Sequence, residues 1–580
     1  MDLPHLGPSR RPMLCAALVA LAVACAPAPP QAPAAPAQPA PAPAAPGPGV
    51  AAAPAPQAVA GTSKDAWYVD PVSLGYEAPA AKGGTFSYAS NNGPLNLDPW
   101  GNNTRQRSFF DTAYDTVMAR RLQPGKSPFA VDMFCRLCES WELSSDKLTL
   151  TFKLRQNVKF HDGKPLTSAD VKFSIEKGAD PKTGFEFRSL MAGMDRVEAP
   201  DPYTLRLVMK SPDADVIRYL NAYPIVPKHI FDDGGDLTKQ VIGTGAFKME
   251  KFDVDNQYAA VKNTDYWVPD RPYLDRMVAH FIGDKSQRQA AFLSKQIDNY
   301  TAGDINEMRP IQAAAKDAKV DNLGGSLVQV YYMNVQKPPL SDKRVRRAMH
   351  LALDRDEENK QLTDGLGVPY LVAGSPSGWQ PHTLTQEDLA KMPGFRKPKD
   401  QDLAEAKRLL TEAGYPNGFK MTSTHIATYT SNPEWNEASS AQMKRIGIDI
   451  TLDPVEVGIG LQRFGECGFD MFVRPSAGGE SMITRNYRRW ITGGSENICK
   501  YSNPEYDKLV EQQAAEFDVA KRWEIVKKIQ LMLMEEVPAL AMSEIASFAA
   551  YHPHLHNWRN FGHSFSMPWN PNAELIWVQK

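Results

Sequence analysis

Long apolar runs and an excess of charge of one sign are both missing from most of this 580-residue sequence. Beyond residue 25, no run approaches the roughly 18 apolar residues that a membrane-spanning helix needs. The 65 Lys and Arg residues nearly balance the 67 Asp and Glu residues, which leaves a net charge of −2. We therefore expect no general attraction to an acidic membrane and predict no nucleic-acid partner.

The common catalytic and metal-binding motifs are also absent. The Gly-x-Ser-x-Gly pattern of many hydrolases has a counterpart at 374–378, but Pro376 occupies its central position and the match fails. His-Glu-x-x-His does not occur. We predict that the protein is not an enzyme and has no cofactor. A cell-envelope hydrolase and a structural role are the alternatives.

Three histidines, His552, His554 and His556, alternate near the C-terminus. On a strand their side chains would share one face, which is attractive for nickel or zinc. Pro553 argues against a regular inner strand, and an exposed terminal segment is the alternative. We predict no metal site.

The N-terminus has the features of an export signal. Arg10 and Arg11 precede a short apolar stretch that ends at residue 24, too short to cross a bilayer and typical of a signal peptide. The stretch 9–14 resembles the twin-arginine export motif, with Met13 in place of the usual Phe, but the general secretory route uses the same charges. We predict an exported protein, periplasmic or at the cell surface, with residues 1–25 as its signal.

Cys25 is the predicted site of a lipid anchor. The stretch 21–24 before it resembles a bacterial lipobox, with Ala22 in place of the usual Leu. Plain cleavage after an Ala-x-Ala-like site is the alternative. Because residues 26–60 are almost only Ala, Pro, Gln, Gly and Val, they have little to bury, and we predict a disordered tether over 26–67.

Strand and helix patterns are mixed along the rest of the chain, which predicts an α/β or α+β fold of two or three domains. Apolar and polar residues alternate over 148–154 and 203–209, as in half-buried strands. A capping-box pattern at 167–170 starts one helix, and 402–405 offers a similar start for another. A last helix is predicted over 519–536.

Glycine and proline residues allow the backbone conformation of two short segments to be predicted. Gly243 and Gly245 bracket a tight entry into a strand, where a positive φ or a close approach of another segment is expected. A nucleotide-binding Gly-x-Gly is excluded because Lys248 stands where a third Gly is needed. The stretch 337–339, Lys-Pro-Pro, should be a crossover loop before a helix capped by Ser341 or Asp342.

A set of short segments occurs in a specific order across 84–550, and each is weak alone. They are 96–99 (NLDP), 139–142 (ESWE), 160–171 (FHDGKPLTSADV), 243–247 (GTGAF), 263–267 (NTDYW), 332–334 (YMN), 337–339 (KPP), 342–348 (DKRVRRA), 353–355 (LDR), 406–414 (AKRLLTEAG), 446–448 (IGI) and 501–507 (YSNPEYD). Together they resemble the extracytoplasmic solute-binding proteins of ABC importers, specifically family 5, the large oligopeptide, dipeptide and nickel-binding type.

The resemblance implies an α/β, bilobed fold like that of the large type II periplasmic binding proteins, with an extra subdomain and a hinge. Lobe I would comprise 84–112, 243–325 and 541–580. Region 113–242 would pack on it, and lobe II would comprise 326–540. The ligand would lie between the lobes, so that its contacts with both shift the population toward a closed state.

The resemblance also directs attention to the segment after 469–472. In peptide-binding relatives a Trp-x-x-Asp element follows this strand, and its Asp pairs with the α-ammonium group of the peptide. This sequence lacks that Asp, and Glu480 is a possible substitute. The departure weakens the case for a free peptide. Arg474 should open into the cleft, where it would bind a carboxylate or phosphate with two hydrogen bonds; a structural or surface salt bridge is the alternative.

The candidate ligand contacts are polar or aromatic residues at strand ends or in loops. Each has a plainer alternative, which is core packing for the aromatic residues and turn formation for Asn. Tyr331 and Tyr332 lie on opposite faces of one strand, so one of them faces the core. The predicted set is Asn91, Asn92, Asn102, Asn103, Tyr331, Tyr332, Trp379, Tyr429 and Arg474.

Four of the six cysteines lie beyond the signal and Cys25, which suggests two disulfides in an exported protein. Three pairings are possible. The implied fold favours Cys135–Cys138 and Cys467–Cys499, because each bond then stays within one lobe and leaves the hinge free. A redox Cys-x-x-Cys and a four-cysteine zinc site are the alternatives, although no second Cys-x-x-Cys exists.

Taken with the resemblance, these features predict the solute-binding component of an ABC importer. It would capture a peptide or a peptide-like solute and deliver it to the permease. An oligosaccharide or a nickel chelate is the alternative ligand within the same family. The expected partners are the solute, the ABC permease subunits and, through the lipid anchor, the membrane. The protein is expected to be a monomer.

Overall fold

The computed structural model describes most of the chain from residue 76 onward. The described residues are 76–91, 93–94, 96–100, 112–121, 132–185, 187–373, 384–427, 432–477, 483–494, 496–558 and 573–579. They belong to one unit, Pro56–Lys580. The predicted signal, tether and lipid site therefore lie outside the described residues, as do Asn92, Asn102, Asn103, Trp379, Tyr429 and Glu480.

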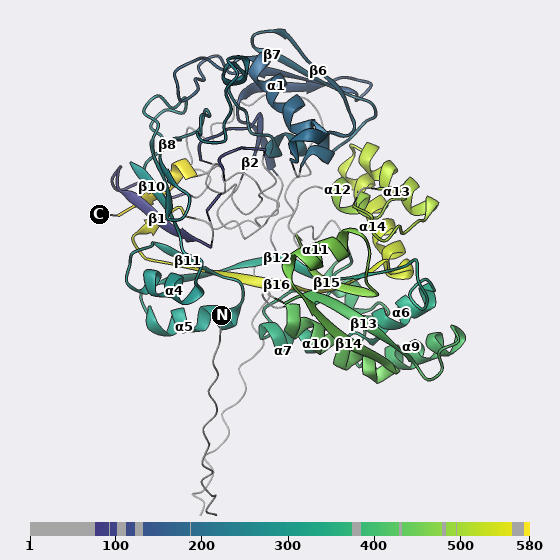
Figure 1. The fold of residues 1–580 in the computed structure, drawn as a ribbon. Helices are drawn as coiled ribbons and strands as arrows, with labels where there is room; N and C mark the ends of the chain where they lie inside the picture. The colour runs from purple at the N-terminus through teal and green to yellow at the C-terminus, as the bar shows by residue number, and fades with distance from the viewer. Residues whose placement is uncertain are drawn as a thin grey trace, which may run out of the picture. The chain divides into compact units, whose positions relative to one another are not determined.

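A mixed sheet of ten strands organises the fold (Figure 1). β13 is parallel to both of its neighbours, as is β1, whereas β12 is antiparallel to both of its neighbours. The mixture confirms the predicted α/β class. The strand order is β14 (Ile448–Val455), β13 (Phe419–Ile426), β15 (Met471–Ala477), β12 (Lys319–Met333), β16 (Ala539–Tyr551), β11 (Asn299–Ala302), β1 (Thr85–Ser90), β10 (Arg276–Phe281), β9 (Gln257–Lys262) and β8 (Phe247–Asp253).

Two long strands, β12 and β16, connect the two halves of this sheet (Figure 1). The first part of β12 pairs with the end of β16, whose last residues also pair with β11. The second part of β12 lies between β16 and β15. The pairing of β12 with β16 shifts register three times between Asn322 and Val330. The lobe boundary predicted at 325/326 lies in this irregular stretch and stays a prediction.

Region 113–242 has its own antiparallel sheet, and both predicted strands, β5 and β7, are adjacent members of it. Leu150, Phe152 and Leu154 of β5 are buried, which confirms the alternating pattern. The order is β4 (Cys138–Leu143), β5 (Thr149–Leu154), β7 (Thr204–Met209) and β6 (Met194–Asp201). The remaining strands are β2 (Met118–Arg121) with β3 (Asp132–Cys135), and β17 (Leu555–His556) with β18 (Trp577–Val578).

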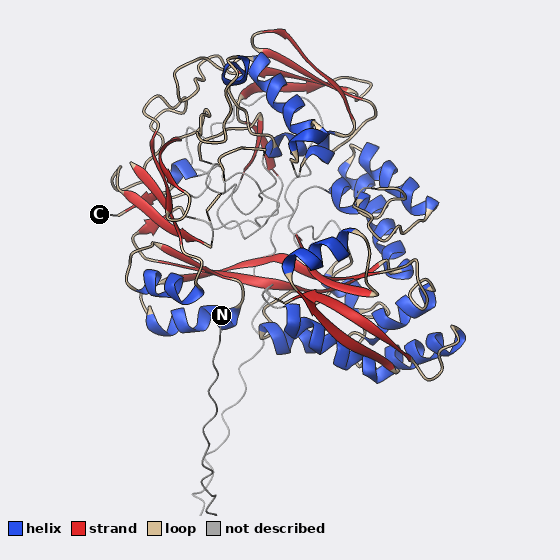
Figure 2. Ribbon diagram, in the orientation of Figure 1, coloured by secondary structure: helices blue, strands red, loops and turns tan. Residues whose placement is uncertain are grey.

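Helices pack on both sides of β13–β15 (Figure 2). In chain order the helices are α1 (Ser168–Ala179), α2 (Val216–Tyr219), α3 (Lys228–Asp232), α4 (Lys285–Leu293), α5 (Ile305–Ala314), α6 (Lys343–Ala352), α7 (Arg355–Thr363), α8 (Gln386–Ala390), α9 (Asp400–Glu412), α10 (Asn432–Met443), α11 (Val457–Gly465), α12 (Ile483–Arg488), α13 (Pro504–Ala515) and α14 (Val519–Glu536).

Helix ends test the sequence predictions closely. At α1 the backbone N–H of Thr167 donates to Asp170, as in the predicted capping box. α14 has both predicted ends, and Asp342 caps α6. The predicted start of α9 at 402–405 is wrong. The helix begins at Asp400, because the carboxylate of Asp402 is buried and accepts from Lys399, 2.8 Å away, instead of capping a helix.

The two glycines of the 243–247 segment allow a close approach rather than a positive φ. A Cβ on Gly243 would lie 2.0 Å from the carbonyl oxygen of Ala113, and one on Gly245 would lie 2.5 Å from that of Thr112. The half-buried His161 joins this segment to the 160–171 segment. It accepts from the N–H of Gly243 at 3.3 Å and donates to the carbonyl of Gly245 at 3.0 Å. Two segments of the family resemblance are therefore in direct contact.

An apolar core and a buried charge network join region 113–242 to segments of the predicted lobe I. The core cluster includes Phe152 and Leu205 from region 113–242 and Phe247 from lobe I. Within it, Arg136 donates to Asp115 at 2.8 Å and to Glu574 at 2.9 and 3.0 Å, although Arg136 and Glu574 are 438 residues apart in sequence. Residues from three distant parts of the chain are therefore needed to complete this core.

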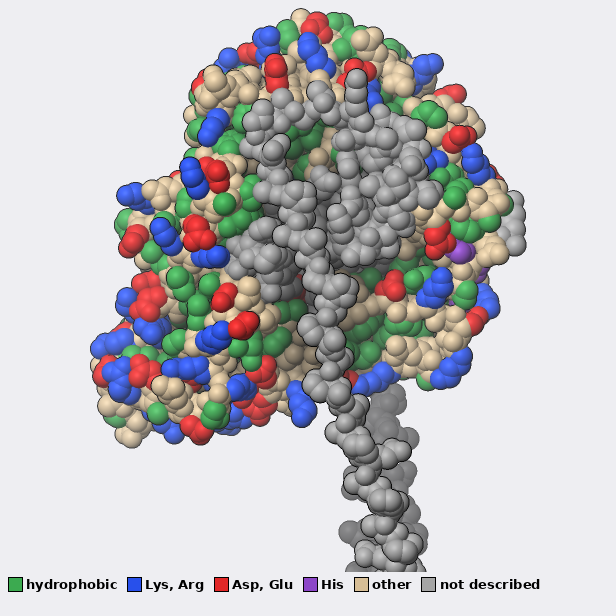
Figure 3. All heavy atoms as spheres, turned by 180° about the vertical axis from the view of Figure 1, so that it is seen from behind, with side chains coloured by type: hydrophobic (Ala, Val, Ile, Leu, Met, Phe, Trp, Pro, Cys, Tyr) green, Lys and Arg blue, Asp and Glu red, His purple; other side chains and the backbone are tan. Residues whose placement is uncertain are grey.

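The described surface carries charges of both signs. On the face shown in Figure 3, Lys and Arg side chains are interspersed with Asp and Glu side chains, and neither sign dominates. This agrees with the near-zero net charge. Of the helices that the structure describes, none has both the length and the apolar character that crossing a membrane requires.

Candidate ligand-binding site

Tyr331 and Tyr332 occupy opposite faces of β12, as predicted, because successive strand residues point to opposite sides of a sheet. Tyr331 is 1% exposed, and its hydroxyl lies 2.7 Å from the carbonyl oxygen of Trp435 and 2.6 Å from the hydroxyl of Ser439. Burial and the nearby carboxyl of Glu358 raise the pKa of Tyr331 well above its usual value. Full burial in a core removes Tyr331 from the set of candidate ligand contacts.

The other face of β12 carries an aromatic cluster that meets Arg474. Tyr332 packs edge-on against Phe464 of α11, with ring centroids 4.9 Å apart, and lies 5.8 Å from the ring of Trp490. Arg474 lies in β15 directly opposite Val330 of β12, so its side chain shares the face of Tyr332. Its guanidinium carbon lies 4.7 Å from the centroid of Phe464. We call Tyr332, Phe464, Arg474 and Trp490 the Arg474 cluster.

Among the described residues, two donors of the Arg474 cluster lack a charged or hydrogen-bonding partner. Arg474 is half-buried, and within the described ranges no acidic side chain forms an ion pair with it. The Nε1–H group of Trp490 is also buried without an acceptor among those residues. Buried donors normally find a partner. A planar guanidinium resting on an aromatic face is suited to bind a carboxylate with two parallel hydrogen bonds.

Of the remaining predicted contacts, the structure describes only Asn91. It is exposed and follows β1, whose place in the sheet is separated from β15 by β12, β16 and β11. The structure thus brings Arg474 and Tyr332 together, places Tyr331 in a core, and leaves Asn91 in the other half of the sheet. Asn92, Asn102, Asn103, Trp379 and Tyr429 lie outside the described residues.

Sequence reasoning missed Phe464 and Trp490. Phe464 lies four residues after Gly460, the buried residue of α11, and this helical spacing marks a core-facing position. Its proximity to Arg474 depends on the pairing of β12 with β15, which no local pattern reveals. Trp490 follows α12 and shows no periodic signal that would assign it to this cluster.

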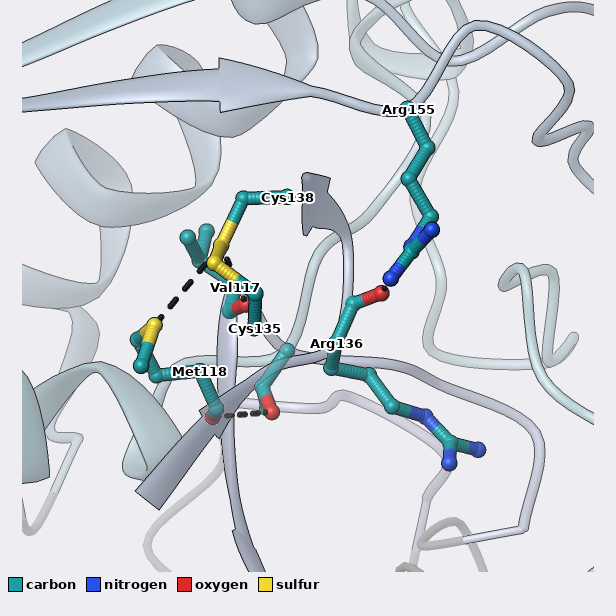
Figure 4. The surroundings of a disulfide bond; sticks show 7 residues. Val117, Met118, Cys135, Arg136, Cys138 and Arg155 are labelled. Carbon is teal, nitrogen blue, oxygen red and sulfur yellow. Dashed lines mark hydrogen bonds between the residues drawn. A yellow bond between two sulfur atoms is a disulfide. The ribbon is translucent and has the colours of Figure 1, made fainter. Parts of the chain in front are cut away.

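The structure contains the two disulfides of the favoured pairing, Cys135–Cys138 and Cys467–Cys499. Figure 4 shows the first, beside Val117 and Met118 and close to Arg136. Arg155 donates to the carbonyl of Arg136 at 2.9 Å, which places this disulfide next to the buried charge network. The second disulfide ties the end of the α11 segment to residue 499, close in sequence to α12 and α13.

The three histidines do not share one strand, contrary to the arrangement that would favour nickel or zinc. β16 ends before His552, and only His556 belongs to β17. Each ring contacts a different partner. His552 contacts the carbonyl of Phe292, His554 contacts Asp298, and His556 contacts Glu77. The described residues contain no group of three or more His, Cys, Asp or Glu side chains placed to hold a metal ion.

Comparisons with known proteins agree with this architecture. The family model "Bacterial extracellular solute-binding proteins, family 5 Middle" matches residues 135–497. The glutathione-binding protein GsiB of Escherichia coli O1:K1 is 26% identical over 432 residues, which cover 69% of this chain and 78% of GsiB.

Solved structures share the fold. The periplasmic binding protein AgaA in complex with agropinic acid, from A. tumefaciens R10, has a TM-score of 0.70 at 22% identity and covers 86% of this chain and 99% of its own. The periplasmic binding protein DppA of Helicobacter pylori, in complex with the peptide STSA, has a TM-score of 0.68 at 23% identity with the same coverage. The predicted bilobed fold is therefore confirmed.

Proposed function

The chain belongs to the bacterial extracellular solute-binding proteins of family 5, and we propose that it captures a peptide or peptide-like solute whose carboxylate binds Arg474. It serves as the solute-binding component of an ABC importer. The observation that carries the proposal is the guanidinium of Arg474, which rests on Phe464 and has no acidic partner in the described part of the chain.

The chemistry of the Arg474 cluster supports a ligand with an anionic and a flat or apolar part. Arg474 supplies two parallel donors for a carboxylate. Trp490 supplies one further donor, and the partly exposed Phe464 supplies an aromatic surface. The names of the relatives, which refer to glutathione, a peptide and agropinic acid, support a small solute of this kind. The missing Asp after β15 argues against recognition of a free α-ammonium group at that position.

The proposal also covers the attachment of the protein to the membrane and the boundaries of its lobes. We propose that residues 1–25 direct export, that Cys25 carries the lipid anchor and that 26–67 tether a monomeric receptor near its permease. The lobe boundaries at 84–112, 243–325, 541–580 and 326–540 are proposed with the same function. Replacing Cys25 by Ala tests the anchor, because the protein should then leave the membrane fraction. Retention of this variant in that fraction would contradict lipidation.

A ligand panel tests the function itself. The full chain is purified, unfolded and refolded to remove bound solute, and thermal stability is measured with short peptides, glutathione, oligosaccharides and metal chelates. We expect peptides with a free C-terminal carboxylate to stabilise the protein more than their C-terminal amides. Arg474→Gln should weaken binding of the free acids roughly 10- to 100-fold, the magnitude of a charged hydrogen bond, and should barely change binding of the amides.

Arg463→Gln is the matched control. Arg463 belongs to the same lobe and pairs with Asp453 at 2.7 Å, outside the Arg474 cluster. It should leave ligand binding unchanged. Equal losses for acids and amides in Arg474→Gln would contradict carboxylate recognition. Stabilisation only by an oligosaccharide or a chelate would overturn the peptide-like ligand and leave the family role intact.

A further inference from the structure

Asp215 forms the centre of a buried charge network between region 113–242 and lobe II. It lies in the turn before α2 and is fully buried. Both of its carboxylate oxygens accept from Arg522 of α14, at 2.9 and 2.8 Å, although the two residues are 307 positions apart. The backbone N–H of Thr484, at the start of α12, donates to the same carboxylate at 2.8 Å.

Neighbouring contacts extend this network along the turn. Asp213 lies 3.3 Å from the guanidinium of Arg488, which also pairs with Glu511 of α13 at 3.0 Å. The N–H of Ala214 donates to the carbonyl of Ala514 at 2.7 Å. Burial alone would raise the pKa of Asp215, but Arg522 and Arg218 outweigh it and lower that pKa well below its usual value. Asp215 is therefore an ionised partner. We call residues 213–215 with Arg488 and Arg522 the 213–215 latch.

The latch lacks the shared apolar cluster that accompanies the buried Arg136–Glu574 pair in the contact of region 113–242 with lobe I. In the described chain, the apolar cluster that includes residues of α13 and α14 contains no residue of region 113–242. Two further contacts across the boundary each place a cation over an aromatic ring: Arg485 lies over Phe187 at 5.3 Å, and Lys147 over Phe517 at 5.0 Å. Charged groups, unlike apolar ones, regain strong hydration when such a boundary separates.

Buried ion pairs of this type add little net stability but are expensive to leave half-made. Boundaries between domains of one chain resemble transient protein interfaces, for which relative motion is the ordinary expectation. We propose that the 213–215 latch is a releasable contact, which holds region 113–242 against α12–α14 and opens to water when the lobes separate. This inference rests on the proposed solute-binding function, because a latch of this kind regulates access to the cleft.

The stability of the closed latch then contributes to the apparent affinity of the protein for its solute. A solute that binds only the closed form binds more weakly in proportion to the fraction of molecules that are open. Asp215→Asn removes a charge while both cationic partners stay, so the open population should rise. The Arg474 cluster remains unchanged by this substitution, and the effect therefore enters through the population and not through a lost ligand contact.

Amide hydrogen exchange tests the latch directly in the full chain without added solute. The N–H groups of Ala214 and Thr484 donate across the boundary and so report its opening from both sides. In Asp215→Asn we expect exchange at both amides to accelerate at least about tenfold. Amides within β5 and β7 should keep their wild-type rates, because their hydrogen bonds stay inside region 113–242.

Asp402→Asn is the matched control. Asp402 is also a fully buried carboxylate that accepts from two cations, Lys399 and Arg396, and from one backbone N–H, that of Gly394. All of its partners lie within lobe II. It should reduce stability without accelerating exchange at Ala214 or Thr484. Equal acceleration in both variants would show a general loss of stability and overturn the latch.

Arg488→Gln provides a second variant at the more exposed end of the latch, in case Asp215→Asn fails to fold. It should accelerate the same two amides by a smaller factor. Wild-type exchange rates in both folded variants would overturn the proposal even if the ligand panel succeeds. Accelerated exchange in a protein that binds no member of the panel would instead sustain the latch and reject the proposed ligand class.

Discussion

Region 113–242 meets its two neighbours through different chemistry. Toward lobe I it shares one continuous apolar cluster, which includes Phe152 and Phe247 and surrounds the buried Arg136–Glu574 pair. Toward lobe II it presents Asp213 and Asp215 to arginines of α12 and α14. Apolar surface is costly to expose to water, whereas charged groups are well hydrated once apart. The first boundary is suited to permanence and the second to separation.

The apolar boundary is the place where the largest loss of stability is expected. Phe247 is fully buried in β8, and Phe247→Ala should reduce the free energy of unfolding by about 3–5 kcal/mol, through lost burial and a residual cavity. Urea unfolding, monitored by circular dichroism, measures this loss of unfolding free energy. Phe252→Ala in the same strand is the control, since Phe252 is only half-buried and should lose less than half as much. Similar losses in both variants would contradict the assignment of Phe247 to the permanent boundary.

The two disulfides should stabilise their regions unequally. The Cys467–Cys499 bond of lobe II spans 32 positions and the Cys135–Cys138 bond spans 3. Loop-closure entropy then assigns them about 4 and about 2 kcal/mol of unfolding free energy respectively. Double Cys→Ser variants of each pair, compared by urea unfolding, measure the difference. A larger loss for the 135–138 pair would show that its position beside the Arg136 network outweighs loop length.

Lobe II should lose stability as pH rises, because of Glu358. Burial raises the pKa of this carboxyl to about 8 from its usual 4.5, although Ser439 donates to it. The folded state therefore keeps a proton that the unfolded state releases between those values. Stability from this group is complete below about pH 4.5 and falls by about 1.4 kcal/mol per pH unit toward pH 8.

Glu358→Gln tests this expectation. The amide oxygen still accepts from Ser439 but cannot ionise, so the variant should be more stable than the wild type at pH 9 and lose that advantage at pH 5. Unfolding midpoints across this range measure it. Parallel pH curves for the two proteins would contradict the raised pKa.

Region 113–242 should respond to pH in the opposite direction, because of His161. Burial lowers its pKa to about 4, and the neutral ring both accepts from Gly243 and donates to Gly245. Stability from this group is complete above pH 6.5 and is lost as pH falls toward 4. His161→Gln should therefore be less stable than the wild type by about 1–2 kcal/mol at pH 7, and the gap should narrow at pH 5. A constant gap would contradict the neutral buried ring.

The sequence predicted best what depends on local chemistry. Both predicted ends of α14 are found in the structure, where Asp518 caps the start of the helix and Pro538 follows its end. The prediction for the start of α9 was wrong because Asp402, a residue type that often caps helices, instead accepts hydrogen bonds from Lys399 and Arg396 in a buried network. Whether an acidic residue caps a helix or joins a network depends on packing that a local pattern does not contain.

The candidate site was predicted only in part, and for a related reason. Arg474 was identified by its place at the end of a predicted strand. Its support by Phe464 and the full burial of Tyr331 depend on strand register and helix packing across the sheet. Asp215 and Arg522 give no sequence signal of their pairing, since each is an ordinary charged residue in its own segment. The alternating pattern of a strand identifies two faces but not what covers each.

The pairing of Arg136 with Glu574 also has a consequence for the time course of synthesis. A ribosome that adds about 5–20 residues per second needs roughly 20–90 s to make the 438 residues that separate them. During that interval Arg136 and Asp115 exist without their last partner, and the core around them stays incomplete. The nascent chain must therefore remain without this finished core until Glu574 has been made, and the exposed groups of the core can be recognised as unfolded for that time.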